Sequence, residues 1–374
     1  MPTDFPHFDA LIIGAGMAGA SLGAEIAADM AVLMIEQEDQ PGYHATGRSV
    51  AFWSESYGGP LVRPLTQASL AALADPDPAF SEDSFLSPRG AVHIGNADDA
   101  TLRDRMIAAF ADNDLLVPMD RSALETRIPG LRPGWSTGVW EASTADIDVA
   151  TLHAAYLRQF RQRGGTLWTD AALTSVERSS RGWTVLTAAG ACTADILINA
   201  AGAWADPVAR LCGVAPLGIQ PLLRNVAQLR TDPAAPADLP LVLDLAEQFY
   251  FKPAGGGRIW LTPHDEHPAL PCDAGPDDLA IATAIARFEQ VVDWKVEAVE
   301  RKWAGLRSFA PDRLPVYGFD RRTPGFFWFA GQGGFGIQTA PAAALLARAR
   351  LTGAAPHAAL SGIDLDRYDP ARFG

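Results

Sequence analysis

Three glycines near the start of the chain have the spacing that lets a backbone approach a phosphate. Gly14, Gly16 and Gly19 follow an apolar run and open an alanine-rich segment that predicts a helix. Gly14 permits a tight turn, Gly16 leaves room for a pyrophosphate, and Gly19 lets the helix pack closely on the strand. The free N–H groups at the helix N-terminus then face the phosphates. Together these residues predict a dinucleotide-binding turn.

An acidic side chain completes this pattern. Glu36 ends the second apolar run, about 20 residues beyond the glycines, where a carboxylate can accept a hydrogen bond from a ribose 2′-hydroxyl. A carboxylate at this place repels a 2′-phosphate, which disfavours NADP. Strand 9–14, helix 16–29 and strand 31–36 therefore predict one Rossmann-type unit.

Two further turns of small residues follow later apolar runs. Residues 195–204 predict a strand that ends in a small-residue turn, and residues 325–339 predict a strand, a glycine turn and a helix start. A nicotinamide enzyme needs no such third turn, whereas a flavoprotein needs separate contacts for its isoalloxazine ring. We expect a helix that opens near residues 333–336 to point its positive end at the flavin N1–C2=O and stabilise the reduced ring. The three turns together favour FAD.

The chain-wide composition is that of a globular protein with more than one domain. Its 374 residues are 48% hydrophobic and 20% charged, and the net charge of −14 argues against nucleic acid or an anionic membrane as the main partner. No apolar run approaches the roughly 20 residues of a membrane span. Residues 1–8 lack the features of a signal peptide, and Cys192, Cys212 and Cys272 form no metal pattern. We therefore expect a cytoplasmic protein with no membrane span and no nucleic-acid partner.

The rest of the chain mixes helices with short strands. Helices are predicted at 61–75, 98–112, 152–164 and 277–292, and strands at 84–95, 139–147, 166–169, 172–178, 182–188 and 190–194. Residues 216–303 predict strands joined by proline-rich loops. His264 and His267 stand in one of these loops, where we expect a solvated turn, so no metal site is predicted.

Five motifs carry a family resemblance that covers almost the whole chain. They are Gly14-Ala-Gly-Met-Ala-Gly19, Pro41-Gly-Tyr-His-Ala-Thr-Gly-Arg-Ser49, Asn199-Ala-Ala-Gly-Ala-Trp204, Trp303-Ala-Gly-Leu-Arg-Ser-Phe309 and Gln332-Gly-Gly-Phe-Gly-Ile-Gln-Thr339. Together they resemble the FAD-dependent D-amino acid oxidase superfamily, which includes glycine oxidase and sarcosine oxidase, and within it most closely the bacterial D-arginine dehydrogenases.

The resemblance implies an α/β fold of two domains. A discontinuous, Rossmann-like FAD-binding domain would comprise residues 1–84, 143–218 and 305–374. An α+β substrate domain built on an antiparallel sheet would comprise residues 85–142 and 219–304.

The resemblance also implies non-covalent FAD and a set of residues that contact it. Val176 would present its backbone to the adenine, and residues 333–338 would hold the flavin ring. The full set is Gly14, Gly16, Ala18, Gly19, Glu36, Gln37, Ala45, Thr46, Gly47, Arg48, Ser49, Val50, Ala51, Phe52, Val176, Ala200, Gly202, Trp204, Gly333, Gly334, Phe335, Gly336, Ile337 and Gln338.

For the substrate, the resemblance implies a carboxylate clamp. Arg307 would fork its guanidinium onto the carboxylate, and Arg224 and Tyr250 would complete the clamp. Tyr57 would lie on a mobile lid, and Gly334 would border the pocket. Such a site moves a hydride from Cα to flavin N5, and the imine then hydrolyses to a 2-oxo acid and ammonia. Solvent can take the amine proton, with His44 as an alternative base.

Two pocket positions depart from the D-arginine dehydrogenase pattern. Ala91 stands where those enzymes carry a glutamate for the guanidinium, and Phe52 stands where they carry a histidine of the lid region. The missing carboxylate removes an ion-pair partner worth several kcal/mol in a desolvated site. We therefore expect a substrate with a small or apolar side chain.

Other functions stay open on the sequence. A glycine- or sarcosine-type amine oxidase would use the same clamp, and a 2-hydroxy acid dehydrogenase of this fold would need an added base near the hydroxyl. A flavin-binding redox protein without turnover is disfavoured by the complete clamp. Short motifs do not encode dioxygen reactivity, so a quinone, a dye-like acceptor and dioxygen all stay open as electron acceptors.

Overall fold

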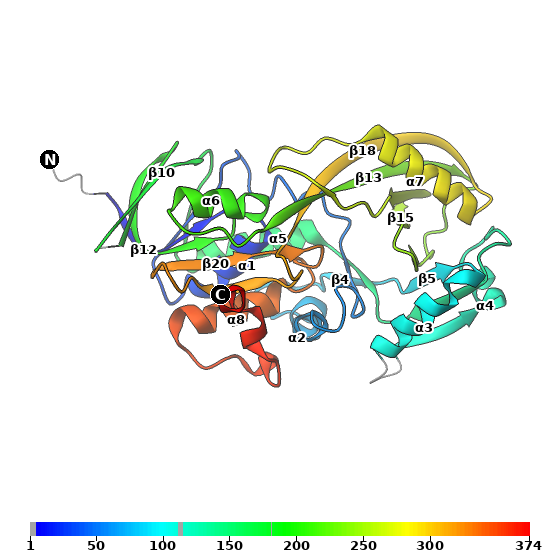
Figure 1. Ribbon diagram of the computed structural model, residues 1–374, viewed down its shortest axis with the longest axis horizontal. Helices are drawn as coiled ribbons and strands as arrows, with labels where there is room; N and C mark the ends of the chain where they lie inside the picture. The colour runs from blue at the N-terminus through cyan, green and yellow to red at the C-terminus, as the bar shows by residue number, and fades with distance from the viewer. Residues whose placement is uncertain (1–4, 111–114, 181) are drawn as a thin grey trace.

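Two β-sheets, one at each end of an elongated molecule, divide the chain into two lobes (Figure 1). The computed structural model describes residues 5–110, 115–180 and 182–374. The parallel-sheet lobe contains an eight-stranded sheet, and the antiparallel-sheet lobe contains a ten-stranded sheet. A small three-stranded sheet of β3 (Phe52–Trp53), β8 (Ala145–Ile147) and β4 (Leu86–Pro88) lies between them.

Five parallel strands form the centre of the parallel-sheet lobe. Their order is β9 (Thr166–Trp168), β2 (Val32–Ile35), β1 (His7–Ile13), β12 (Gly190–Asn199) and β20 (Phe326–Ala330). The strands are nearly continuous apolar runs because both faces of the sheet are covered. Three helices pack on one face, namely α1 (Met17–Ile26), α5 (Val149–Gln162) and α8 (Ala340–Thr352), while α6 (Ala205–Leu211) packs on the other.

The strand order brings the three small-residue turns together. These turns follow the carboxyl ends of β1, β12 and β20, which are neighbours in the sheet, and Glu36 follows the adjacent β2. The carboxyl ends of parallel strands meet at one edge, where α/β sheets bind their ligands. Segments from the start, the middle and the end of the chain therefore share one edge.

Antiparallel strands extend this sheet on two sides. β10 (Leu173–Ser179) and β11 (Gly182–Thr187) form a meander with the first half of β12, and β19 (Val316–Phe319) pairs with β20. The sequence predicts a break in β12 after residue 194, but the structure has one strand of 10 residues. This strand is continuous because its first half pairs with β11 and its second half with β20.

The predicted helices are present with small shifts at their ends. They correspond to α2 (Arg63–Ala74), α3 (Ala100–Ala109), α5 and α7 (Asp278–Val291). Residues 111 and 112 of the predicted helix 98–112, and residues 1–4 of the predicted FAD domain, lie outside the described residues.

The expected helix start near residues 333–336 is wrong. Residues 334–339 form successive turns, and α8 begins only at Ala340, with Pro341 in its first turn. Glycine disfavours a helix interior, whereas proline suits the first helical turn. The turn backbone, rather than a helix end, therefore borders the site.

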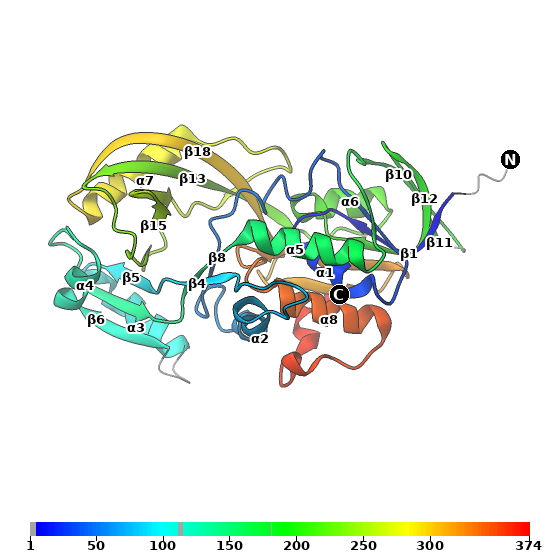
Figure 2. The ribbon, with the colours of Figure 1, turned by 180° about the vertical axis from the view of Figure 1, so that it is seen from behind.

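Two long strands connect the lobes. β13 (Gln220–Asp232) and β18 (Lys295–Phe309) pair along their whole length and arch from the parallel-sheet lobe over the other lobe (Figures 1 and 2). The sheet continues through β16 (Arg258–Thr262), β15 (Tyr250–Gly255), β14 (Leu241–Asp244), β5 (Ala91–Gly95), β7 (Thr137–Glu141) and β6 (Leu116–Asp120). The edge strands β17 (His267–Pro268) and β21 (Gln332–Gly333) complete it, and α7 and α4 (Arg121–Arg127) pack against it.

The fold class expected from the sequence is confirmed. The sheet is antiparallel apart from the β14–β5 pair, and its strands come mainly from the segments predicted for the substrate domain. β18 crosses the predicted boundary at residues 304/305 as one unbroken strand, and the domain limits themselves stay a prediction.

Candidate active site

One cavity runs from the carboxyl edge of the parallel sheet to the beginning of the β13–β18 pair. It is lined by the small-residue turns at one end and by arginine and tyrosine side chains at the other. Of the site residues expected from the sequence, the lining contains Gly14, Gly16, Ala18, Glu36, Gln37, Ala45, Thr46, Arg48, Ser49, Val50, Ala200, Gly202, Trp204, Arg224, Tyr250, Arg307, Gly333, Gly334, Gly336 and Ile337.

The other expected residues lie outside the lining. They are Gly19, Gly47, Ala51, Phe52, Tyr57, Ala91, Val176, Phe335 and Gln338. Gly19 has a packing role, because a Cβ there would lie 1.9 Å from the carbonyl oxygen of Gly14. Val176 packs against the core beneath the sheet, and Ala171, Ala172 and Leu173 line the cavity at that end.

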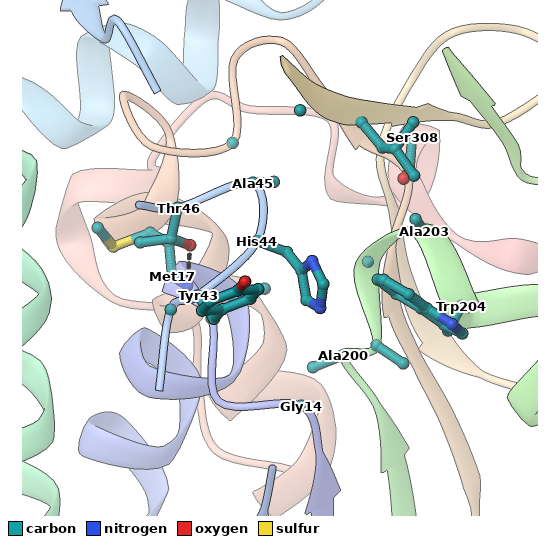
Figure 3. Close-up of a pocket in the computed structure, with 18 of the residues that line it drawn as sticks. Gly14, Met17, Tyr43, His44, Ala45, Thr46, Ala200, Ala203, Trp204 and Ser308 are labelled. Carbon is teal, nitrogen blue, oxygen red and sulfur yellow. Dashed lines mark hydrogen bonds between the residues drawn. The ribbon is translucent and has the colours of Figure 1, made fainter. Parts of the chain in front are cut away.

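The first glycine turn is a tight cradle at the edge of the sheet. Gly14 has φ +103°, and a Cβ there would lie 2.6 Å from the oxygen of Ala200. Glu36, 8% exposed, accepts a hydrogen bond from the N–H of Ala15 at 2.9 Å. Thr46 Oγ1 accepts one from the N–H of Met17 at 2.9 Å (Figure 3). This close backbone approach, with a buried carboxylate beside it, fits the pyrophosphate and ribose of FAD.

Aromatic side chains face each other across the middle of the cavity. In Figure 3, Tyr43 and His44 lie opposite Trp204, and the His44 and Trp204 ring centroids are 4.6 Å apart. His44 Nε2 is also 2.8 Å from Glu38 Oε1. This hydrogen bond gives His44 a protein partner and favours a positioning role over that of a substrate base.

Arg48 ties this loop to the other lobe. Its guanidinium pairs with Asp273 and donates hydrogen bonds to the carbonyl oxygens of Ala274, at 3.0 Å, and Ala304, at 3.2 Å. The Arg48 carbonyl in turn accepts from Trp303 Nε1 at 2.9 Å. The loop that borders the cavity is thus fixed to both lobes.

An arginine with two tyrosines occupies the far end of the cavity. Arg307 donates from Nη1 to Tyr57 Oη at 2.8 Å and from Nη2 to Tyr250 Oη at 3.2 Å. Phe52 packs on both phenol rings, with centroid distances of 5.1 Å to Tyr57 and 5.9 Å to Tyr250. A Cβ at position 334 would lie 2.1 Å from Tyr57 Oη, so any side chain there would displace the Tyr57 hydroxyl from its present place.

Arg224 adds a second, incompletely paired guanidinium. Its side chain is buried, at 4% exposure, and its Nη2 lies 3.4 Å from Glu266 Oε1. Its Nε and Nη1 have no hydrogen-bond partner within the part of the chain that the structure describes. Buried donors of a charged group are normally satisfied, and a carboxylate is the usual partner of such a fork. Arg224 is therefore suited to an anionic ligand.

The electrostatics keep this cluster positively charged. Burial and the nearby Arg307 charge lower the pKa of Arg224 to about 10. Burial lowers the pKa of Arg307, but the hydroxyls of Tyr57 and Tyr250 outweigh it, so that pKa is raised overall. Burial raises the pKa of Tyr57. At neutral pH the site presents two cations beside the protonated phenol of Tyr57.

The wall beside the clamp is apolar. Val50, Val226 and Tyr250 line the cavity there, and the fully buried Ala91 packs behind them in one cluster with Phe52, Leu241 and Leu243. Burial of an arginine side chain against such a wall would leave its charge unpaired. The composition of this cluster fits a small or apolar substrate side chain.

Two residues near the clamp are not predicted from the sequence. The expectation of a solvated turn is wrong for His264, which is half-buried and stacks edge-on against Tyr250 with a centroid distance of 5.6 Å. Burial, with Arg224 and Arg307 nearby, lowers the pKa of His264 to about 2. The second residue is Glu141, a fully buried carboxylate behind the Tyr57 loop. The one signal in the sequence is that Glu141 is an acidic residue at the end of an apolar strand.

Two other expectations concern metals and membranes. Within the described ranges, the one group of three potential metal ligands is His7, Asp9 and Asp195. It lies at the start of β1, at the opposite end of that strand from the glycine turn. Among the helices of the described residues, none has the length and apolar character of a membrane span.

Comparison with known proteins agrees with this geometry. Residues 9–350 match the family model described as "FAD dependent oxidoreductase" (DAO). A glycine oxidase from Pseudomonas putida is 27% identical over 370 residues, covering 92% of this chain and 95% of the relative. An N-methyl-L-tryptophan oxidase from Salmonella arizonae is 26% identical over 274 residues, covering 69% of this chain and 70% of the relative.

A solved structure gives the same result for the fold. The crystal structure of glycine oxidase from Geobacillus kaustophilus superposes with a TM-score of 0.84 at 20% identity, covering 98% of this chain and 99% of that one. The narrower resemblance to D-arginine dehydrogenases stays a prediction. The chain belongs to the DAO family of FAD-dependent oxidoreductases, and FAD is its cofactor.

Proposed function

We propose that the protein oxidises a D-amino acid with a small or apolar side chain at Cα, giving an imine that hydrolyses to a 2-oxo acid and ammonia. One observation carries this proposal. A guanidinium with two tyrosine hydroxyls, Arg307 with Tyr57 and Tyr250, lies beside the incompletely paired Arg224 at the Gly334 end of the cavity. Such a set binds one carboxylate in a fixed orientation.

The clamp would act by placement. Arg307 and Arg224 hold the carboxylate, and the phenol proton of Tyr57 remains available to donate to it because the Tyr57 oxygen accepts from Arg307. The substrate side chain would then lie against Val50 and Val226, the apolar residues that line the cavity beside the clamp, and the direction of the Cα–H would be fixed. FAD, when bound along the glycine turns, accepts the hydride.

The same charges help to deprotonate the amine. Two guanidinium groups near a bound amino acid disfavour a third positive charge, so the pKa of the substrate ammonium falls. The proton can pass to solvent, and neutral His264 neither adds charge nor is required as the base. Loss of one proton from the ammonium and then of a hydride from Cα leaves an iminium, which becomes the neutral imine when a second proton leaves its nitrogen.

A second candidate is a glycine- or sarcosine-type amine oxidase. It is favoured by the relatives, which are named glycine oxidase and N-methyl-L-tryptophan oxidase. The apolar wall suits a substrate without a side chain or with an N-methyl group equally well. Because one of these relatives is named for an L-configured substrate, configuration must be tested directly.

The deciding experiment mixes the holoenzyme anaerobically with each compound of a substrate panel and measures the absorbance of the flavin band. The panel contains alanine, leucine and arginine in both configurations, with glycine, sarcosine and D-lactate. Bleaching by D-alanine or D-leucine but not by the L-forms supports the proposal. Bleaching by glycine or sarcosine alone supports the second candidate, and bleaching by D-lactate alone supports a hydroxy acid dehydrogenase.

The electron acceptor and the location belong to the same proposal. Hydrogen peroxide release during turnover would identify an oxidase, whereas turnover only with a quinone or a dye would identify a dehydrogenase. A cytoplasmic location stays a prediction of the sequence.

A further inference from the structure

A buried carboxylate lies behind the loop that carries Tyr57. Glu141 ends β7 and is 0% exposed. Its Oε1 accepts from the N–H of Glu55 at 2.8 Å and from Ser54 Oγ at 3.0 Å, and its Oε2 accepts from Ser56 Oγ at 2.5 Å. His93 Nε2 lies 3.6 Å from Oε2. A charge removed from water is tolerated only with such partners.

These partners keep Glu141 ionised. Burial raises the pKa of its carboxyl group, but the nearby His93 ring and the hydrogen bonds from Ser56 and Ser54 together lower it further than burial raises it, so the pKa is lowered overall. The side-chain oxygens of Glu141 accept hydrogen bonds from Ser54, Glu55 and Ser56, directly before Tyr57. We call residues 54–57 the Tyr57 segment. The Glu141 carboxylate therefore binds this segment through hydrogen bonds.

A buried amide holds the same segment from the other side. Gln338 is 1% exposed; its Oε1 accepts from the N–H of Ser54 at 3.1 Å, and its Nε2 donates to the carbonyl of Tyr57 at 3.3 Å. Gln338 directly follows the turn that lines the cavity with Gly336 and Ile337. The Tyr57 segment is thus held between strand β7 of one lobe and the third glycine turn of the other.

These contacts determine where the Tyr57 hydroxyl lies. Gly58 and Gly59, with φ +92° and +79°, follow the segment directly. The Tyr57 side chain reaches from the segment to Arg307 and to the backbone of Gly334. A mobile lid is expected from the sequence. The hydrogen bonds describe an anchored segment, which must lose several buried contacts before Tyr57 can move away.

We propose that Glu141 is a positioning residue, which acts through the backbone and serines of the Tyr57 segment to hold the Tyr57 hydroxyl on Arg307. The clamp then presents one geometry to the incoming carboxylate. The kinetic part of this inference rests on the proposed function, while the positioning of the segment does not.

The first test measures the segment without any substrate. Hydrogen–deuterium exchange of the FAD-loaded Glu141→Gln variant is compared with wild type and with Glu125→Gln, a control at an exposed carboxylate paired with Arg121 at 2.6 Å. Exchange should accelerate in peptides that cover residues 54–59 in Glu141→Gln only. Unchanged exchange in these peptides, or acceleration spread over the whole chain, overturns the proposal.

The second test is a double-mutant cycle on flavin reduction by an amino acid that bleaches the wild-type enzyme. Glu141→Gln should raise the substrate dissociation constant about tenfold, the size expected for one misplaced hydrogen bond to a charged group. In a Tyr57→Phe background the same change should add little, because Glu141 acts through the lost hydroxyl. Independent, multiplicative effects would overturn the proposal.

If Glu141→Gln does not fold with FAD bound, a milder variant can replace it in both tests. Ser56→Ala removes one donor and keeps the carboxylate, so it should give the same pattern with a smaller amplitude; an amplitude of zero in both tests overturns the proposal. If no panel compound reduces the flavin of the wild type, the proposed function fails, whereas the exchange experiment still decides the role of Glu141.

Discussion

The Tyr57 hydroxyl accepts a hydrogen bond from Arg307 at 2.8 Å although 250 positions separate the two residues in the chain. The long β13–β18 pair brings Arg307 from one lobe to the cavity, and the loop after β3 brings Tyr57 from the small sheet between the lobes. Burial raises the pKa of Tyr57, so the phenol keeps its proton. The pair therefore offers a carboxylate a guanidinium and a hydroxyl donor together.

Removal of the Arg307 guanidinium should weaken substrate binding without loss of FAD. We expect Arg307→Met to raise the substrate dissociation constant by about 100-fold, since it removes charged hydrogen bonds. Rapid anaerobic flavin reduction measures this constant, and absorbance at the flavin band measures FAD content. Arg301→Met, at an exposed position of the same strand, is the matched control. Kinetics equal to wild type would remove Arg307 from the site.

Side-chain preference should change when a charge is placed in the apolar wall. Ala91→Glu combined with Phe52→His introduces the acid and the histidine that the D-arginine dehydrogenase pattern carries. We expect the ratio of kcat/KM for D-arginine to that for D-leucine to rise at least about tenfold, because a desolvated ion pair forms only with arginine. The unliganded variant should be less stable, since Ala91 is fully buried. A ratio that stays constant would contradict the assignment of this wall to the side-chain pocket.

His264 should make the protein sensitive to acid. Its folded-state pKa is lowered to about 2, below the unfolded value of about 6.5. The unfolded chain therefore binds more protons between these values, and stability falls as pH decreases below about 6.5. We expect His264→Gln to lose less Tm than wild type on transfer from pH 7 to pH 4.5, with the exposed His267→Gln as the control. Parallel loss of Tm in wild type and His264→Gln would show that His264 is not buried near the two arginines.

FAD should be released when the protein is denatured. Among the three cysteines, Cys192 and Cys212 are buried in the core, and Cys272 alone lines the cavity. We expect acid precipitation to leave the yellow colour in the supernatant, and Cys272→Ser to keep the wild-type FAD content. Flavin that stays with the pellet in wild type but not in Cys272→Ser would demonstrate a covalent bond.

The cofactor end of the site could be predicted from the sequence because its determinants are local. Gly14, Gly16 and Glu36 lie within one βαβ unit, and the glycine turn, the helix and the acid follow directly from their spacing. The sequence alone does not show that this turn meets those at residues 200–204 and 333–336, because that depends on the order of the strands in the sheet. The rules for parallel sheets predict only that such turns share one edge.

The anchors of the substrate end could not be predicted in the same way. Glu141 and Gln338 act on the Tyr57 segment through contacts that span 85 positions or more, as in the Ser56–Glu141 pair. Nothing in the local sequence near Glu141 distinguishes a buried acceptor from a surface acid. The burial of His264 is not predicted for the same reason, since its proline-rich surroundings indicate a loop but not the strands that pack against it.

The strand order of the parallel sheet also bears on how the enzyme is made. β20, which pairs with β12 at the cofactor edge, is followed by the turn that lines the flavin end of the cavity, and both come after the first two small-residue turns in the chain. Synthesis proceeds from the N-terminus, so a nascent chain that has already formed the first glycine turn still lacks one wall of its cofactor site. Complete enclosure of FAD therefore requires β20 and the turn after it as well as the first glycine turn, so it follows the synthesis of all five parallel strands.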